Sequence, residues 1–165
     1  MKILILGAGR VGSSLASTLS KQEYEVSIVD LNKDKLLRLQ EDYDLATEIG
    51  HASHPSTLER AGADQDTILL AVTNSDECNI TSCQIAKSKF KVKKTICRLS
   101  DSSYLQSLEA FGEKNIDIAI GPENEVTEHL ADLIRHPGAE QIESFANGSL
   151  KVLSLIHISE PTRRR

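Results

Sequence analysis

The chain has 165 residues and a formal net charge of −5 at pH 7, since 19 lysines and arginines stand against 24 aspartates and glutamates. A chain of this length buries roughly 70% of the surface that its unfolded form exposes, which excludes a small scaffold held by disulfides or a structural metal. The acidic balance, with three tyrosines, three phenylalanines and no tryptophan, excludes the basic surface and aromatic platforms of nucleic-acid-binding proteins. We expect one domain with part of a second, and no nucleic-acid partner.

Three cysteines, Cys78, Cys83 and Cys97, lie within apolar stretches and form no Cys-x-x-Cys pair. This pattern favours buried free thiols in a reducing cytosol over a disulfide or a zinc site. The apolar run at the N-terminus, Ile3–Leu6, is too short for a signal peptide or a spanning helix. We expect a cytoplasmic protein whose link to a membrane runs through a partner.

Strand-like and helix-like patterns alternate along residues 1–122. Short apolar or β-branched runs predict strands at Ile3–Leu6, Glu25–Val29, Leu45–Ile49, Thr67–Val72, Thr95–Leu99 and Ile116–Ile120. Amphipathic stretches between them predict helices that begin near Val11, after Asn32, at Ser56, after Asn74 or Ser75, and at Ser102 or Ser103, the last ending at Phe111. Strict alternation implies right-handed crossovers and a parallel sheet. The predicted fold class is therefore α/β, a Rossmann-like doubly wound six-stranded parallel sheet of order 3-2-1-4-5-6.

Two of these helices carry capping signals. Asn32 is a preferred residue type for an N-cap and precedes the second helical pattern. Asn74 and Ser75 can both cap the fourth helix, and Glu77, three residues after Asn74, has the spacing of a capping box.

The architecture changes after residue 122. The spacing of Val126, Leu130, Leu133 and Ile134 predicts a crossover helix over 123–137 with these residues on one face. Residues 138–155 contain the turn pair Asn147-Gly148 between two strand-like runs, which predicts a hairpin that begins a truncated second subdomain. Residues 156–165 have no periodicity and are interpreted as a disordered or vector-derived tail.

A glycine-rich motif follows the first strand and opens the first helix. It consists of Gly7, Ala8, Gly9, Arg10, Val11 and Gly12 and fits G-x-G-x-x-G. Asp30 follows at the end of the next strand, near the spacing of about 20 residues that completes a dinucleotide-binding fingerprint. Gly7 is expected to allow the tight turn, Gly9 to leave room for a pyrophosphate, and Gly12 to let the helix pack closely on the sheet.

These residues also predict the ligand class. The phosphates would meet the N-terminal end of the helix, where Arg10 either adds a charged contact or is a solvated surface residue. Asp30 can accept hydrogen bonds from an adenosine ribose but would repel a 2′-phosphate, so NAD(H) is favoured over NADP(H). ATP and ADP also carry a free ribose and stay open as ligands.

Further strand ends are expected at the same crevice, because ligands of open α/β sheets bind outside the carboxyl ends of the strands. Thr73 and Asn74 can approach the ligand or simply cap a helix, and Arg98 can reach a phosphate or form a surface ion pair. His51 and His54 are interpreted as loop histidines with polar partners, since no third ligand in register supports a metal.

The motifs together resemble the TrkA family, the cytosolic regulatory subunits of bacterial Trk potassium uptake systems, which are built from RCK (KTN) domains. The resemblance covers about residues 1–152, with these segments: Gly7–Gly12, Asp30, Gly50–Pro55, Ala61–Ala63, Leu70–Glu77, Asn79 and His136–Ala139. It implies a nucleotide-sensing module that binds NAD(H), and often ATP or ADP, and docks on an integral-membrane potassium translocator at the inner face of the membrane. The chain would be an N-terminal fragment of such a subunit.

The resemblance also implies a set of ligand-binding residues: Gly7, Ala8, Gly9, Arg10, Val11, Asp30, Thr73, Asn74 and Arg98. Gly12, the last glycine of the same loop, completes the predicted cofactor-binding set. One departure concerns Gly50-His51, where many RCK modules carry Gly-Asp, so a carboxylate near the ligand is missing.

An NAD-dependent oxidoreductase is the alternative function. Its short-chain class needs Tyr-x-x-x-Lys, but the residues four places after Tyr24, Tyr43 and Tyr104 are Ile28, Thr47 and Leu108. Too few residues follow the sixth strand to form a substrate domain, and a redox-sensing transcription factor would need a basic winged helix. We therefore expect no catalytic residues and no enzyme activity. The apolar face of the 123–137 helix has to be covered either by its own domain or by a second copy of the chain. The resemblance implies that such a helix packs against a neighbouring module, so we expect at least a dimer.

Overall fold

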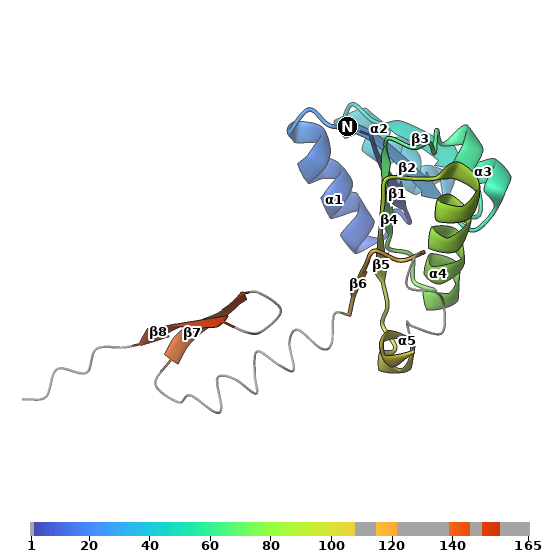
Figure 1. Ribbon diagram of the computed structural model, residues 1–165. Coiled ribbons are helices and arrows are strands. Elements are labelled where there is room, and N and C mark those ends of the chain that lie inside the picture. Colours follow the sequence, from blue (N-terminus) through green and yellow to red (C-terminus); the bar gives the residue numbers. More distant parts are fainter. Residues whose placement is uncertain (1, 108–114, 122–138, 146–149, 156–165) are drawn as a thin grey trace, which may run out of the picture. The chain divides into compact units, whose positions relative to one another are not determined.

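The computed structural model describes residues 2–107, 115–121, 139–145 and 150–155 (Figure 1). The chain divides into two compact units, Met1–Pro122 and Glu123–Arg165, and each is described by itself. The predicted crossover helix over 123–137, the turn Asn147-Gly148 and the tail 156–165 lie outside the described residues.

The first unit is a six-stranded parallel sheet of order β3-β2-β1-β4-β5-β6, which confirms the predicted fold class and strand order. Its strands are β1 (Lys2–Leu6), β2 (Glu25–Asp30), β3 (Ala46–Ile49), β4 (Thr67–Ala71), β5 (Lys94–Arg98) and β6 (Ile118–Ile120). Its helices are α1 (Arg10–Lys21), α2 (Lys33–Asp42), α3 (Pro55–Arg60), α4 (Asp76–Ile85), η1 (Ala86–Phe90) and α5 (Ser102–Gln106). The chain order of the strands reverses direction between β1 and β4, where a ligand cleft is expected.

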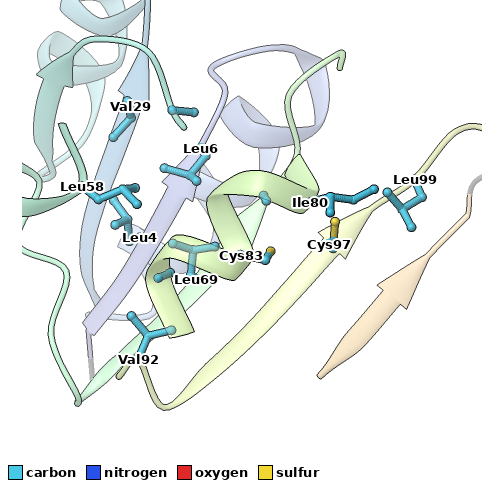
Figure 2. Packing of buried hydrophobic residues seen from close by; sticks show 13 residues of the cluster. Leu4, Leu6, Val29, Leu58, Leu69, Ile80, Cys83, Val92, Cys97 and Leu99 are labelled. Carbon is cyan, nitrogen blue, oxygen red and sulfur yellow. The ribbon is translucent and has the colours of Figure 1, made fainter. Parts of the chain in front are cut away.

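The continuous apolar run of β1 occupies the middle of the sheet and is buried on both faces. Ile3 and Ile5 belong to the core cluster that includes Ala16 of α1 and Leu36 of α2. The alternate residues Leu4 and Leu6 belong to the opposite cluster, with Leu58 of α3 and Cys83 of α4 (Figure 2). Each fully buried leucine or isoleucine contributes about 1.5–3 kcal/mol. Two apolar faces on one strand therefore hold the two helical layers against one sheet.

The cap of α2 agrees with the sequence, and the cap of α4 is one of the two predicted candidates. Asn32 caps α2, because its side-chain oxygen accepts from the backbone N–H groups of Asp34 and Lys35 at 2.9 and 3.2 Å. For α4 the cap is Ser75, so the capping box built on Asn74 is wrong by one residue.

The helix α5 begins at Ser102, one of the two predicted starts. Its cap is Asp101, whose carboxylate accepts from the backbone N–H of Ser103 at 2.8 Å. Among the described residues α5 ends at Gln106, and the predicted continuation to Phe111 falls within residues that the structure does not describe.

The strand β6 begins at Ile118 and not at the predicted Ile116. The reason is a side-chain pairing that replaces the ladder there: the backbone N–H of Thr95 donates to the Asp117 carboxylate at 2.6 Å, and that of Asp117 donates to Oγ1 of Thr95 at 3.0 Å. Two side chains therefore satisfy the backbone groups that regular strand pairing would satisfy.

The helical turn that follows α4 is wider than an α-helical turn. Residues Ala86–Phe90 form a π-helical turn, η1, and Lys91 closes it with a φ of 56°. The chain then enters β5 through Val92, which is buried, and through Lys93, whose N–H donates to the carbonyl of Thr67 at 2.9 Å.

The second unit contains β7 (Ala139–Phe145) and β8 (Leu150–Leu155), paired antiparallel. This pair agrees with the predicted hairpin strands. None of the helices within the described residues is long and apolar enough to cross a membrane.

The Asp117 carboxylate contributes stability that depends on pH. Burial raises its pKa, but hydrogen bonds from Lys87, whose Nζ lies 2.7 Å away, and from Thr95 outweigh burial and hold the pKa below its ordinary value. A lowered folded-state pKa adds stability above the ordinary range near 4, and this stability is lost as the pH falls through the folded pKa.

Asp117→Asn is expected to lower the free energy of unfolding at pH 7 by about 1–3 kcal/mol, because it leaves Lys87 without its charged partner. Its free energy of unfolding should also fall less steeply than that of wild type between pH 5 and 2. Urea denaturation across this range measures both effects, with the exposed Asp66→Asn as control. An unchanged acid limb in Asp117→Asn would contradict the assignment.

Candidate functional site

A cleft of about 360 Å³ opens at the carboxyl ends of the central strands. Its lining comes from the ends of β1, β2, β3 and β4 and from the first turns of α4: Gly7, Val29, Asp30, Leu31, Gly50, His51, Ala52, Ser53, Thr73, Asn74, Ser75, Glu77, Cys78 and Thr81. Four of the predicted site residues, Gly7, Asp30, Thr73 and Asn74, therefore lie in one cleft. Ala8, Gly9, Arg10, Val11, Gly12 and Arg98 are not among the residues that line it.

The β1–α1 turn requires glycine at two positions for different reasons. Gly7 has a φ of 103°, and an added Cβ would lie 3.0 Å from the Cα of Thr73. At Gly12 an added Cβ would lie 1.8 Å from the carbonyl oxygen of Gly7, so α1 packs closely against the end of β1. The predicted turn and packing roles of these two glycines are confirmed.

Gly9 differs from both, because an added Cβ there would meet nothing within 4 Å. Gly9 is the N-cap of α1 and gives the first turn no side-chain hydrogen bond. The helix therefore presents its N-terminal end to open space, as an anion site requires. Arg10 is the first residue of α1, and its side chain is exposed.

Asp30, the last residue of β2, holds the glycine-rich turn that follows β1. One carboxylate oxygen accepts from the backbone N–H of Ala8 at 2.6 Å, and the other accepts from that of Asn32 at 2.8 Å. A carboxylate has about four lone-pair sites, so two remain for a ligand. The sequence predicted a ribose acceptor here, and the structure adds that the same carboxylate anchors the turn.

Thr73, Asn74 and Arg98 have different surroundings. The hydroxyl of Thr73 donates to Oδ1 of Asn79 at 2.7 Å, so it belongs to a network behind the cleft. Asn74 lines the cleft, and the cap of α4 is its neighbour Ser75, so the capping alternative for Asn74 is wrong. Nη1 of Arg98 lies 3.4 Å from the carbonyl oxygen of Thr73, and among the described residues Arg98 forms no ion pair.

The predicted polar partner is present for His51, and the two loop histidines also contact each other. Nδ1 of His51 lies 2.9 Å from the hydroxyl of Ser53, and the His51 and His54 rings are stacked with centroids 5.0 Å apart. No cluster of three or more metal-ligating side chains occurs within the described part of the chain.

Sequence reasoning missed two buried polar residues on α4. Asn79 is 0% exposed and Asp76 is 9% exposed, and both make hydrogen bonds to the segment around β5. Asn79 lies on the same helical stripe as Cys83 and Ala86, at i, i+4 and i+7. A polar residue on an apolar stripe was the available signal.

Two carboxylates, those of Asp30 and Glu77, line the cleft. A backbone N–H and the hydroxyls of Ser75 and Tyr104 donate to Glu77 and hold the pKa of its carboxyl below the ordinary value, so it stays ionised. Positive charge comes from outside the lining, where Arg10 and Arg98 lie.

A doubly wound sheet with a glycine-rich β1–α1 turn and an acidic residue at the end of β2 defines a Rossmann-like domain. The chain belongs to the TrkA-N domain family, whose model matches residues 3–122. It is 42% identical over 158 residues to the Trk system potassium uptake protein TrkA of Vibrio alginolyticus, covering 94% of this chain and 34% of that protein. The chain thus spans about a third of the length of this relative.

Solved structures agree on the fold. The TrkA-N domain of the inner membrane protein ybaL from Escherichia coli superposes with a TM-score of 0.67 at 19% identity, covering 81% of this chain and 96% of that one. The GsuK channel bound to NAD superposes with a TM-score of 0.60 at 18% identity, covering 88% of this chain and 24% of that one.

Proposed function

We propose that this chain is the nucleotide-sensing part of a regulatory subunit of a Trk-type potassium uptake system. The observation that carries the proposal is the pairing of Asp30 in the cleft with the open N-terminal end of α1 at Gly9. These two features accept a ribose and a phosphate chain respectively. NAD(H) is the first ligand class, with ATP or ADP as further candidates.

The proposed ligand follows the carboxyl edge of the sheet. The adenosine ribose would hydrogen-bond to Asp30, and the exposed side chain of Leu31, 68% exposed at the rim of the cleft, offers apolar contact to the base. The pyrophosphate would lie over Gly9, near the backbone of Ala8, Val11 and Gly12 and the side chain of Arg10. The remaining half would approach Thr73, Asn74 and Arg98.

The nucleotide in this proposal is a regulator and not a reactant. The relative from Vibrio alginolyticus is a potassium uptake protein, and the fold neighbour bound to NAD is a channel. We propose that the intact protein is at least a dimer in the cytoplasm and binds an integral-membrane potassium translocator at the inner face of the membrane. The nucleotide domain would comprise 1–122, followed by a crossover helix over 123–137, a second subdomain from 138 to 155 and a tail of 156–165.

Calorimetric titration with NADH tests the ligand assignment. Asp30→Asn is expected to weaken NADH binding about 10–100-fold, because a charge-assisted hydrogen bond contributes about 1.5–3 kcal/mol. Wild type should bind NADH more tightly than NADPH, since Asp30 repels a 2′-phosphate, and Asp30→Asn should narrow that difference.

Glu25→Gln is the matched control, because Glu25 is an exposed carboxylate at the opposite end of the same strand. It should bind NADH as wild type does. Wild-type affinity in Asp30→Asn, with Glu25→Gln unchanged, would remove Asp30 from the site.

A further inference from the structure

The beginning of α4 borders two parts of the domain at once. Its cap Ser75 and the side chains of Glu77 and Cys78 line the cleft. Asp76 and Asn79, on the same turn, are buried and bond to the chain at the end of β5. This turn therefore lies between the proposed nucleotide site and the β5–α5 connection.

Asn79 joins the ends of β4 and β5 through one side chain. Its Oδ1 accepts from the backbone N–H of Thr73 at 3.0 Å and from the Thr73 hydroxyl at 2.7 Å. Its Nδ2 donates to the carbonyls of Thr73 at 3.2 Å and Arg98 at 2.9 Å. A primary amide has two donors and an oxygen with two lone pairs, so its whole hydrogen-bonding capacity is used.

The contacts continue to α5. Both carboxylate oxygens of Asp76 accept from the backbone N–H of Ser100, at 2.9 and 2.8 Å, and one of them also accepts from that of Asp101 at 2.8 Å. Asp101 is in turn the N-cap of α5. The carboxylate of Glu77, which lines the cleft, accepts from the hydroxyl of Tyr104 at 3.1 Å. Asp76, Glu77 and Asn79, all in the first turn of α4, thus hold residues 98–104 in place.

We propose that Asn79 is a positioning residue of the nucleotide site, and that the first turn of α4 couples occupancy of the cleft to residues 98–104. This coupling rests on the proposed nucleotide binding. Asn79 does not line the cleft, so it acts through the backbones of Thr73 and Arg98, which it fixes. A ligand that contacts Thr73 and Asn74 binds more tightly when this backbone is held, and by reciprocity its binding stabilises the segment that α4 holds.

Amide hydrogen exchange of the full chain, with and without saturating NADH, tests the coupling. In wild type NADH should slow exchange at residues 7–13 and 73–79 and also at 100–104, which lie beyond the proposed contact at Arg98. Asn79→Asp keeps both acceptor contacts but places a carboxylate oxygen against the carbonyls of Thr73 and Arg98. It should weaken NADH binding about tenfold and abolish the slowing at 100–104.

Ser82→Ala is the matched control. Ser82 is also fully buried on α4, but its hydroxyl donates within the helix to the carbonyl of Cys78 at 2.6 Å. This variant should keep the NADH affinity within about twofold and keep the slowing at 100–104, because its lost contact lies outside the network.

Asp76→Asn separates the coupling from NADH binding, because Asp76 does not line the cleft. It also tests the coupling if Asn79→Asp does not fold. It should bind NADH within about threefold of wild type and keep the slowing at 7–13 while losing it at 100–104. Slowing at 100–104 that survives in either variant overturns the coupling, as does the absence of slowing at 100–104 in NADH-bound wild type. Failure of wild type to bind NADH, ATP and ADP overturns the proposed function itself.

Discussion

Gly12→Ala is expected to destabilise the nucleotide domain by at least about 3 kcal/mol, a large fraction of a typical stability of 5–15 kcal/mol. An added Cβ would lie 1.8 Å from the backbone carbonyl oxygen of Gly7, so α1 would have to move away from β1. Alanine is the better helix former by about 1 kcal/mol, so the stability would fall even though the intrinsic helix propensity rises. Urea denaturation followed by far-UV circular dichroism measures it.

Gly9→Ala is the matched control for stability. It adds the same methyl group three residues earlier, where nothing lies within 4 Å and where φ is −77°. Its free energy of unfolding should fall by no more than about 1 kcal/mol, the loss expected when alanine replaces glycine at an N-cap. Equal stability of the two variants would show that the close approach of α1 to Gly7 has no energetic weight.

Gly9→Ala is expected to have its large effect on binding. The methyl group would project into the open space at the N-terminal end of α1, where the proposed pyrophosphate lies. NADH affinity should fall about 100-fold or more, equivalent to about 3 kcal/mol. Calorimetry with NADH and ADP measures this loss.

Adenosine provides the internal control for that experiment, because it carries a ribose for Asp30 but no phosphate. Its weaker binding should be nearly the same in wild type and Gly9→Ala. Undiminished NADH affinity in a folded Gly9→Ala protein would place the phosphates elsewhere.

The sheet could be predicted from the sequence because its signals are local. Each strand is a short apolar run, and the rules for βαβ connections convert their alternation into one strand order. The residue that caps α4 could not be chosen from the sequence, since Asn74 and Ser75 are adjacent and both have capping side chains. Similarly, the apolar residue Ile116 extended the predicted sixth strand, while the pairing of Thr95 with Asp117 delays its start to Ile118.

The candidate site could also be predicted only in part. Gly7, Gly12 and Asp30 could be found because each has a fixed position relative to a strand end. Asn79 and Asp76 could not be assigned, because their partners at Arg98 and Ser100 lie 19 and 24 residues away along the chain. The sequence pattern of a helix identifies which face is buried, but not which distant backbone groups that face contacts.

The wide turn at Ala86–Phe90 bears on how this domain can change in length. A π-helical turn holds one residue more than an α-helical turn of the same span. Deleting one residue there would either tighten the turn or displace β5 along β4 by one position. Because side chains alternate between the two faces of a strand, that displacement would exchange the buried Thr95 and Cys97 for their less buried neighbours. Insertions and deletions should therefore be tolerated less between α4 and β5 than in a surface loop of equal length.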